Sequence, residues 1–164
     1  MERRQQSPQQ IIFLSIFLAS LFLVIGTLLT ISSNVQYGQT LVPIALIFYI
    51  SRLSPFAFGT WAGLMWPGSH PRAYVLMGVC IGLVDLTAVV FAASAIAGTL
   101  ALGAAAWIEH TSYHALLPIA LFVSGGIFGD FVQDKLGEKS ANYVLGIVAA
   151  AVTTLGTIIT ILLK

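Results

Sequence analysis

The sequence predicts an all-α protein, a polytopic bundle of transmembrane helices. Its composition is 58% hydrophobic and only 8% charged, with a mean hydropathy of +0.96, whereas soluble domains carry about 25% charged residues. The apolar residues gather in runs of about 18–25 residues, long enough to cross a hydrocarbon core of about 30 Å as helices. No polar stretch is long enough for a soluble domain. We expect one membrane domain, residues 11–164, after a polar tail, residues 1–10.

The first apolar run, Ile11–Ile31, follows the tail that carries Arg3 and Arg4. A secretory signal has an apolar region of about 7–15 residues and a small-residue cleavage site after it. This run is longer, and no clear site of that kind follows. It is therefore expected to be an uncleaved first transmembrane helix.

The second apolar region, Leu41–Trp66, is interrupted at its centre by the sequence SRLSP, which contains Arg52 and Pro55. Proline removes a helical hydrogen bond and disfavours helix at the preceding residue, so a kink or break is expected there. Three alternatives stay open: one kinked span, a short span followed by an interfacial helix, or two half-helices that enter the membrane and return.

Three further apolar runs are expected to span the membrane: Ala73–Ala97, Ala115–Val132 and Ala141–Leu163. The segment Gly98–Ile108 would make the preceding helix too long for one span if it continued that helix. Its glycines offer places to break, which favours a short interfacial or re-entrant piece. Alternatively, the chain turns back near Ser94 and makes six spans in all.

The distribution of basic residues favours five spans with a cytoplasmic N-terminus. If Leu41–Trp66 crosses once, the cytoplasmic side carries Arg3, Arg4, Arg72, Lys135 and Lys139. If that region returns to its starting side, the last three of these move outside, against the tendency of Lys and Arg to stay in the cytoplasm. The expected location is a cell or inner membrane, crossed several times.

Several functional classes find no support in the sequence. The net charge of +1 gives no basic field for nucleic acid. A single cysteine, Cys80, excludes an internal disulfide and a Cys-clustered metal site. No serine-hydrolase, P-loop or H-E-x-x-H motif is present, so the sequence indicates no enzyme, no catalytic residue and no cofactor.

Arg52 and Asp85 are the ionisable residues that fall deepest in the apolar runs. Both lie about equally far along the chain from the expected turn at Gly68 and Ser69, so helical arms would bring them to similar depth. A carboxylate there costs about 2.5–3.5 kcal/mol, which an Arg–Asp pair offsets. The pair is either a structural lock between two helices or a site for a substrate, ion or proton; a third alternative leaves Arg52 at the interface, apart from Asp85.

Glu109, His110 and His114 form the sequence E-H-x-x-x-H at the expected outer surface. Histidines four apart on a helix can bind a transition metal, with a carboxylate as a third ligand. The short outer loop argues against a regular helix, so we expect solvated loop residues and no metal site. A haem between spans is disfavoured because these two histidines and His70 all lie at expected membrane edges.

Asp130 lies inside the end of the span Ala115–Val132, behind the glycines of the sequence GGIFG. Those glycines could admit another helix or a ligand close to the backbone. Asp130 would then pair with Lys135 or with a ligand, and it is the third candidate for substrate binding beside Arg52 and Asp85.

Small residues recur four apart in six pairs: Gly59 and Gly63, Gly78 and Gly82, Ala93 and Ala97, Ala101 and Ala105, Gly125 and Gly129, Gly146 and Ala150. This spacing puts both members of a pair on one helix face and lets backbones approach closely. Packing within the molecule is the first interpretation; the alternative is a face for a second copy or another membrane subunit.

The sequence GGIFGD at residues 125–130, with KLGEKS at residues 135–140 and another apolar run after it, resembles the later helices of the substrate-binding S-components of energy-coupling factor transporters. Those proteins are small bundles, generally of six helices, that bind vitamins or related micronutrients. They work with a partner transmembrane subunit and ATPases. The resemblance implies a binding subunit of a transport system.

Two functions are therefore weighed. The first is a small transport-type membrane protein that binds or conducts a small solute or ion between helices, with Arg52, Asp85 and Asp130 at the site. The second is a non-catalytic accessory or scaffold subunit of a larger membrane complex, in which the Arg52–Asp85 pair is purely structural. A membrane-embedded enzyme that uses the E-H-x-x-x-H sequence ranks below both.

Overall fold

The computed structural model describes residues 7–37, 42–66, 68–97, 111–137, 139–144, 146–147 and 149–150. All regular elements in these ranges are helices: α1 (Pro8–Tyr37), α2 (Val42–Met65), α3 (Pro71–Ala97), η1 (Ser112–Leu116), α5 (Leu117–Phe131) and η2 (Val132–Leu136). The short π-helices η1 and η2 continue α5 at its two ends without a break. The prediction of an all-α protein is confirmed for this part of the chain.

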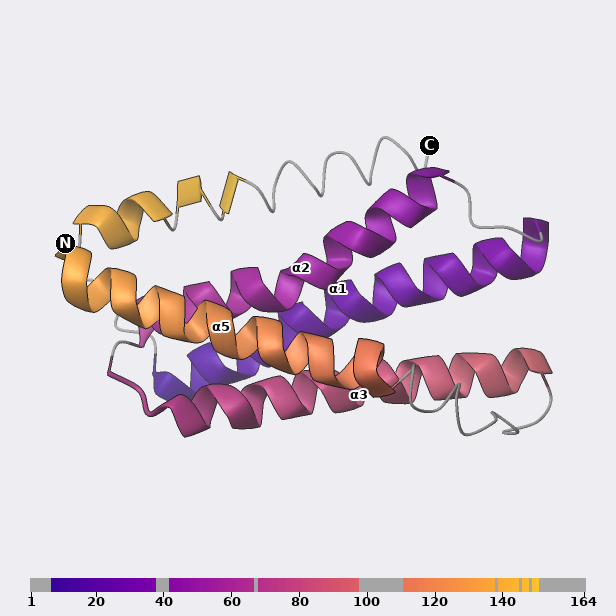
Figure 1. Cartoon of the computed structure of the whole chain (residues 1–164), viewed down its shortest axis with the longest axis horizontal. Coiled ribbons are helices and arrows are strands. Elements are labelled where there is room, and N and C mark those ends of the chain that lie inside the picture. Colours follow the sequence, from indigo (N-terminus) through magenta and orange to yellow (C-terminus); the bar gives the residue numbers. More distant parts are fainter. Residues whose placement is uncertain are drawn as a thin grey trace.

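Among the described residues, four helical segments are long and apolar enough to cross a membrane: Pro8–Ser33, Val42–Met65, Pro71–Ala92 and Ser112–Lys135. They lie along the long axis of the molecule, with α1 and α3 running in one direction and α2 and α5 in the other (Figure 1). This alternation is what successive membrane crossings require. The structure therefore supports a membrane-spanning helical bundle.

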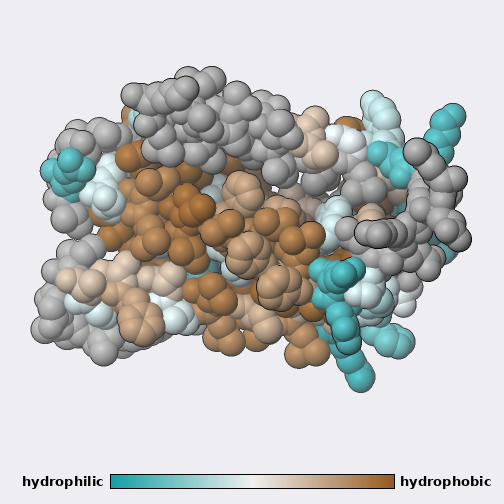
Figure 2. Space-filling view, turned by 180° about the vertical axis from the view of Figure 1, so that it is seen from behind, coloured by the Kyte–Doolittle hydropathy of each residue, from teal (hydrophilic) through white to brown (hydrophobic). Residues whose placement is uncertain are grey.

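The surface agrees with this interpretation. An apolar band covers the middle of the molecule, and hydrophilic side chains gather at its two ends (Figure 2). Many large apolar side chains of the described helices are exposed, among them Phe13 (70% exposed), Phe91 (72%) and Leu76 (68%). Exposure of so many large apolar side chains to water is unfavourable, whereas the lipid of a membrane solvates them.

The region 41–66 forms one continuous helix where the structure describes it, which decides between its three alternatives. α2 passes through Pro55 without a break, and its course bends in Figure 1. Proline is tolerated inside membrane helices because neighbouring helices and hydroxyl side chains satisfy freed backbone groups. Pro55 is fully buried, and beside it Ser54 Oγ donates a hydrogen bond to the Ala19 carbonyl (3.4 Å), which links α2 to α1.

The helices are arranged so that α2 and α3 lie diagonally. α2 packs mainly on α1 and α5, and α3 packs on the same two helices, while α2 and α3 barely touch. This arrangement places the facing sides of α2 and α3 at the centre of the bundle.

Glycines allow the closest approach in the molecule, between α2 and α5. A Cβ added at Gly59 or Gly63 would overlap carbonyl oxygens of α5, and one added at Gly125 or Gly129 would overlap carbonyl oxygens of α2. Gly82 of α3 likewise lies against the backbone of Ala115. A Cβ added at Gly82 would be 2.7 Å from the Ala115 carbonyl oxygen. The predicted packing of these small-residue faces within the molecule is confirmed.

Other expectations lie wholly or partly outside the described residues. α3 continues through Ser94, so the chain does not turn back there, and the six-span alternative that rests on such a turn is wrong. Outside the described ranges are the segment Gly98–Ile108, the tail up to residue 6 and most of Ala141–Leu163. Also outside them are the alanine pair at 101 and 105 and the side chains of the pair at 93 and 97.

Candidate functional site

Four polar side chains, one from each spanning segment, meet inside the bundle. Thr27 comes from α1, Arg52 from α2, Asp85 from α3 and His114 from η1; we call them the polar cluster. Their exposed fractions are 2%, 4%, 0% and 8%. Since Arg52 and Asp85 are charged and His114 can be, their burial is costly and marks the candidate site.

An ion pair across the diagonal of the bundle forms the centre of the polar cluster. Arg52 Nη1 donates to Asp85 Oδ2, and Arg52 Nη2 donates to the hydroxyl of Thr27 (2.6 Å). Thr27 in turn donates to the other carboxylate oxygen, Asp85 Oδ1 (3.1 Å). The predicted Arg52–Asp85 pair is therefore confirmed, and the alternative that keeps Arg52 apart from Asp85 is wrong.

His114 approaches both members of the pair with a single ring nitrogen. Its Nδ1 lies 2.9 Å from Asp85 Oδ2 and 3.1 Å from Arg52 Nη2. Asp85 Oδ2 is thus shared by Arg52 and His114. The three side chains form a compact triangle in which each contacts the other two.

Two aromatic rings cover the guanidinium. Its Cζ lies 4.5 Å from the ring centre of Phe48 and 5.4 Å from that of Tyr113, and the two rings are stacked 6.0 Å apart. Phe48 is one turn before Arg52 on α2, and Tyr113 precedes His114 in η1. Cation–π contacts of this kind contribute about 2 kcal/mol or more where the cation is desolvated.

One donor of the guanidinium is unsatisfied. Arg52 Nε is buried and has no hydrogen-bond partner within the described residues. A buried donor without an acceptor costs about 1–3 kcal/mol. The polar cluster therefore has an N–H group that an acceptor atom of a ligand would satisfy.

The polar cluster lies towards the end of the bundle where α1 ends and η1 begins. Thr27 is less than two turns before Ser33, the end of the first candidate span, and His114 is within one turn of Ser112, the start of the fourth. Arg52 is about 15 Å along α2 from Val42. With the predicted cytoplasmic N-terminus, this end faces the outer side.

His114 corrects our expectation of a solvated loop residue at the membrane edge. It is buried and falls inside the span Ser112–Lys135, because the helix begins before Ala115 with the π-helical turn η1. A signal was available, since the expected span Ala115–Val132 is shorter than the 20 or so residues that a crossing helix needs. Adding one turn before it brings His114 into the candidate span.

The rest of the E-H-x-x-x-H sequence, Glu109 and His110, lies outside the described residues. Within them, no group of three or more His, Cys, Asp or Glu side chains is placed to hold a metal ion. Thr27, the other residue that the sequence did not reveal, carries no signal of its own, because threonine is common in membrane helices and often bonds only its own backbone.

Asp130 is the candidate that does not join the polar cluster. Its Oδ1 accepts a hydrogen bond from the backbone N–H of Gly68 (2.6 Å), whose φ of +74° forms the turn between α2 and α3. This turn is at the opposite end of α2 from Val42. The expected partner Lys135 instead pairs with Asp134 (2.9 Å). Asp130 therefore holds a turn at the other end of the bundle.

We predict that Asp130→Ala lowers the free energy of unfolding by about 1 kcal/mol, because the Gly68 N–H loses a charged acceptor in a partly solvated turn. Asp134→Ala is the matched control, since it removes an exposed carboxylate four residues later and should cost no more than about 0.5 kcal/mol. Thermal unfolding in detergent measures both. Equal losses in the two variants would contradict the assigned role of Asp130.

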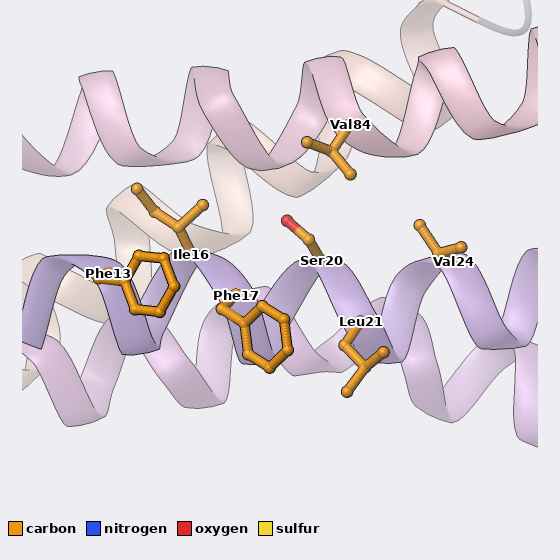
Figure 3. Close-up of a pocket in the computed structure, with 7 residues that line it drawn as sticks. All are labelled: Phe13, Ile16, Phe17, Ser20, Leu21, Val24 and Val84. Carbon is orange, nitrogen blue, oxygen red and sulfur yellow. The ribbon is translucent and has the colours of Figure 1, made fainter.

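An apolar groove of about 380 Å³ lies between α1 and α3 (Figure 3). It is lined by Phe13, Ile16, Phe17, Ser20, Leu21, Val24 and Val84. Apart from the hydroxyl of Ser20, its wall offers no group to fix a polar solute. The groove suits an acyl chain of the bilayer, and the polar cluster is the better candidate for specific recognition.

No protein family model matches the chain, and no curated protein or solved structure matches it either. The resemblance of its later helices to S-components thus stays a prediction from the sequence. The geometry of the polar cluster is therefore the main indication of function.

Proposed function

We propose that the chain is a small, multi-pass membrane protein of transport type, located in a cell or inner membrane, and that the polar cluster binds the small solute or ion it carries. The observation that carries this proposal is the convergence of four helices on one buried Arg–Asp pair. A lock between two helices needs only the pair itself. Here Thr27 and His114 add contacts from two more helices.

This arrangement links binding to helix packing. Any ligand that replaces a contact of Arg52 or Asp85 changes the bonding of all four helices together, which is how a buried site can drive a rearrangement. Arg52 would hold an anionic group or an acceptor atom, for which its Nε is unsatisfied. Asp85 would balance the charge or bind a cation or proton.

The resemblance to S-components supports the binding-subunit form of this proposal, in which other membrane subunits complete the transport system. The glycine faces at residues 59–63 and 125–129 contact each other and leave no room for a partner helix. Among the described residues, no atom lies within 4 Å of a Cβ added at Gly146, so the helix face at Gly146 is the better candidate for a second copy or a partner subunit.

The second candidate function is an accessory or scaffold subunit, favoured by the near-complete burial of the polar cluster. In this alternative the pair only fixes the helices. The two candidates differ in whether the binding of any ligand depends on Asp85.

The test is the thermal stability of the detergent-purified protein against a panel of vitamins, metal ions and pH values. A ligand that binds only the folded state raises stability by about 2.7 kcal/mol at a hundredfold excess over its Kd. We expect this shift in the wild type and its loss in Asp85→Asn.

Asp134→Asn, the same change at an exposed carboxylate, is the control and should keep the full shift. No shift of the wild type by any member of the panel, together with strong destabilisation by Asp85→Asn alone, would contradict transport and favour the accessory subunit.

A further inference from the structure

We infer that the polar cluster binds a proton at His114 Nδ1 and that this proton weakens the Arg52–Asp85 pair. The inference rests on the proposed function and names the ion. Nδ1 lies between a guanidinium nitrogen of Arg52 at 3.1 Å and a carboxylate oxygen of Asp85 at 2.9 Å.

One nitrogen cannot satisfy both neighbours. A guanidinium nitrogen only donates hydrogen bonds and an ionised carboxylate only accepts them. If Nδ1 carries its lone pair, it accepts from Arg52 and faces the Asp85 oxygen without a proton between them. If Nδ1 carries a proton, it donates to Asp85 and loses the bond from Arg52. The geometry thus contains two alternative bonding states that differ in whether Nδ1 carries a hydrogen; from the neutral Nε2–H tautomer, the second state is reached by taking up one proton.

Proton uptake converts the first state into the second. A proton adds to the Nδ1 lone pair of the neutral ring, whose other nitrogen carries its own hydrogen. One N–H bond forms, the Arg52 Nη2–His114 Nδ1 hydrogen bond breaks, and the charge summed over Arg52, Asp85 and His114 changes from 0 to +1. No oxidant, reductant or further reactant is needed.

The bound proton acts on the central ion pair because both cations then use one oxygen. Arg52 Nη1 and His114 Nδ1 both contact Asp85 Oδ2. A protonated His114 competes for that oxygen and repels the guanidinium beside it, so Arg52 is driven towards its other contact on α1, Thr27. Proton binding in η1 is thereby transmitted to α2, α3 and α1.

Burial favours a proton over a larger cargo in this conformation. Exposed fractions of 0–8% leave the polar cluster little surface for a solute, whereas a proton needs no volume. Within the described residues, the charged or titratable groups that face His114 are Arg52 from α2, Asp85 from α3 and the neighbouring Tyr113 of its own helix; α1 offers the Thr27 hydroxyl. Histidine is the side chain that ordinarily changes charge between pH 5 and 8.

The test is ¹⁵N NMR of the full-length protein with labelled histidine, titrated from pH 9 to pH 4, with the His114 signal identified by its loss in His114→Gln. We expect Nδ1 of His114 to gain a proton in the wild type. In Asp85→Asn this proton gain should be lost or much weakened over the same pH range, since the carboxylate that receives the new N–H bond is gone. The signal of exposed His70 should be the same in both proteins.

A second measurement covers the case in which Asp85→Asn does not fold. In the wild type, the ¹³C signal of the Asp85 carboxyl should shift at the same pH as His114, because the two groups exchange partners together. The inference is overturned if His114 stays neutral down to pH 4, or if the ¹³C signal of Asp85 does not change at the pH where His114 gains its proton.

The outcomes separate the inference from the proposed function. If His114 does not titrate but a solute of the panel still stabilises the protein in an Asp85-dependent way, only the proton inference fails. If His114 does not titrate and nothing in the panel shifts the wild type, both fail.

Discussion

Arg52→Met is expected to lower the free energy of unfolding by about 3–5 kcal/mol, because Asp85 then keeps a buried negative charge without its cation. Asp85 is 0% exposed, so water cannot replace the guanidinium unless the helices separate. Thr27 and His114 would be left as its only contacts. Asp85→Leu should lower the free energy of unfolding by the same amount, since it leaves the buried positive charge of Arg52 without its carboxylate.

The double variant Arg52→Met/Asp85→Leu should recover most of this loss. Replacing both partners of a buried ion pair by apolar groups is often neutral or stabilising. Reversible unfolding in mixed micelles measures the four stabilities and gives the coupling energy. Losses that simply add in the double variant, or single variants within about 0.5 kcal/mol of the wild type, would contradict a buried pair.

Gly63→Val is expected to have the second largest effect, a loss of about 2–3 kcal/mol. A Cβ at Gly63 would overlap the carbonyl oxygen of Gly126 and lie 2.7 Å from the backbone nitrogen of Asp130. Both obstacles are backbone atoms of α5, which cannot rotate away as a side chain can. α2 and α5 must therefore separate along their closest contact, with the cost typical of an overpacked core.

The matched control is Gly146→Val, the same substitution at a helical glycine with no atom of the described residues within 4 Å of the added Cβ. It should change stability only by the difference in helix propensity, a few tenths of a kcal/mol in favour of Val. The same unfolding measurement compares the two variants. Equal stabilities at positions 63 and 146 would show that α2 and α5 do not approach as closely as described.

Much of the bundle could be predicted because the membrane restricts the choice of structures. Backbone groups in hydrocarbon must be bonded internally, so apolar runs of sufficient length become helices. The same cost made Arg52 and Asp85 conspicuous in the sequence, and equal distances from one turn predicted that they meet. Glycine spacing predicted close packing for the same physical reason, since small residues allow backbone contact.

What the sequence did not reveal depends on tertiary arrangement and on helix ends. The diagonal placement of α2 and α3 follows from how all four helices pack, and no local pattern encodes it. His114 was misplaced because the start of its helix was set one turn too late. Asp130 resembled a buried site residue, whereas its partner is a backbone N–H of a turn distant in sequence.

The most direct test of a functional polar cluster is the ligand response of the double variant Arg52→Met/Asp85→Leu, since its fold should be preserved. We predict that a ligand or proton that stabilises the wild type leaves this variant unchanged, although both proteins unfold at similar free energies. An undiminished response in the double variant would contradict a functional polar cluster, because the binding site would then lie elsewhere in the molecule.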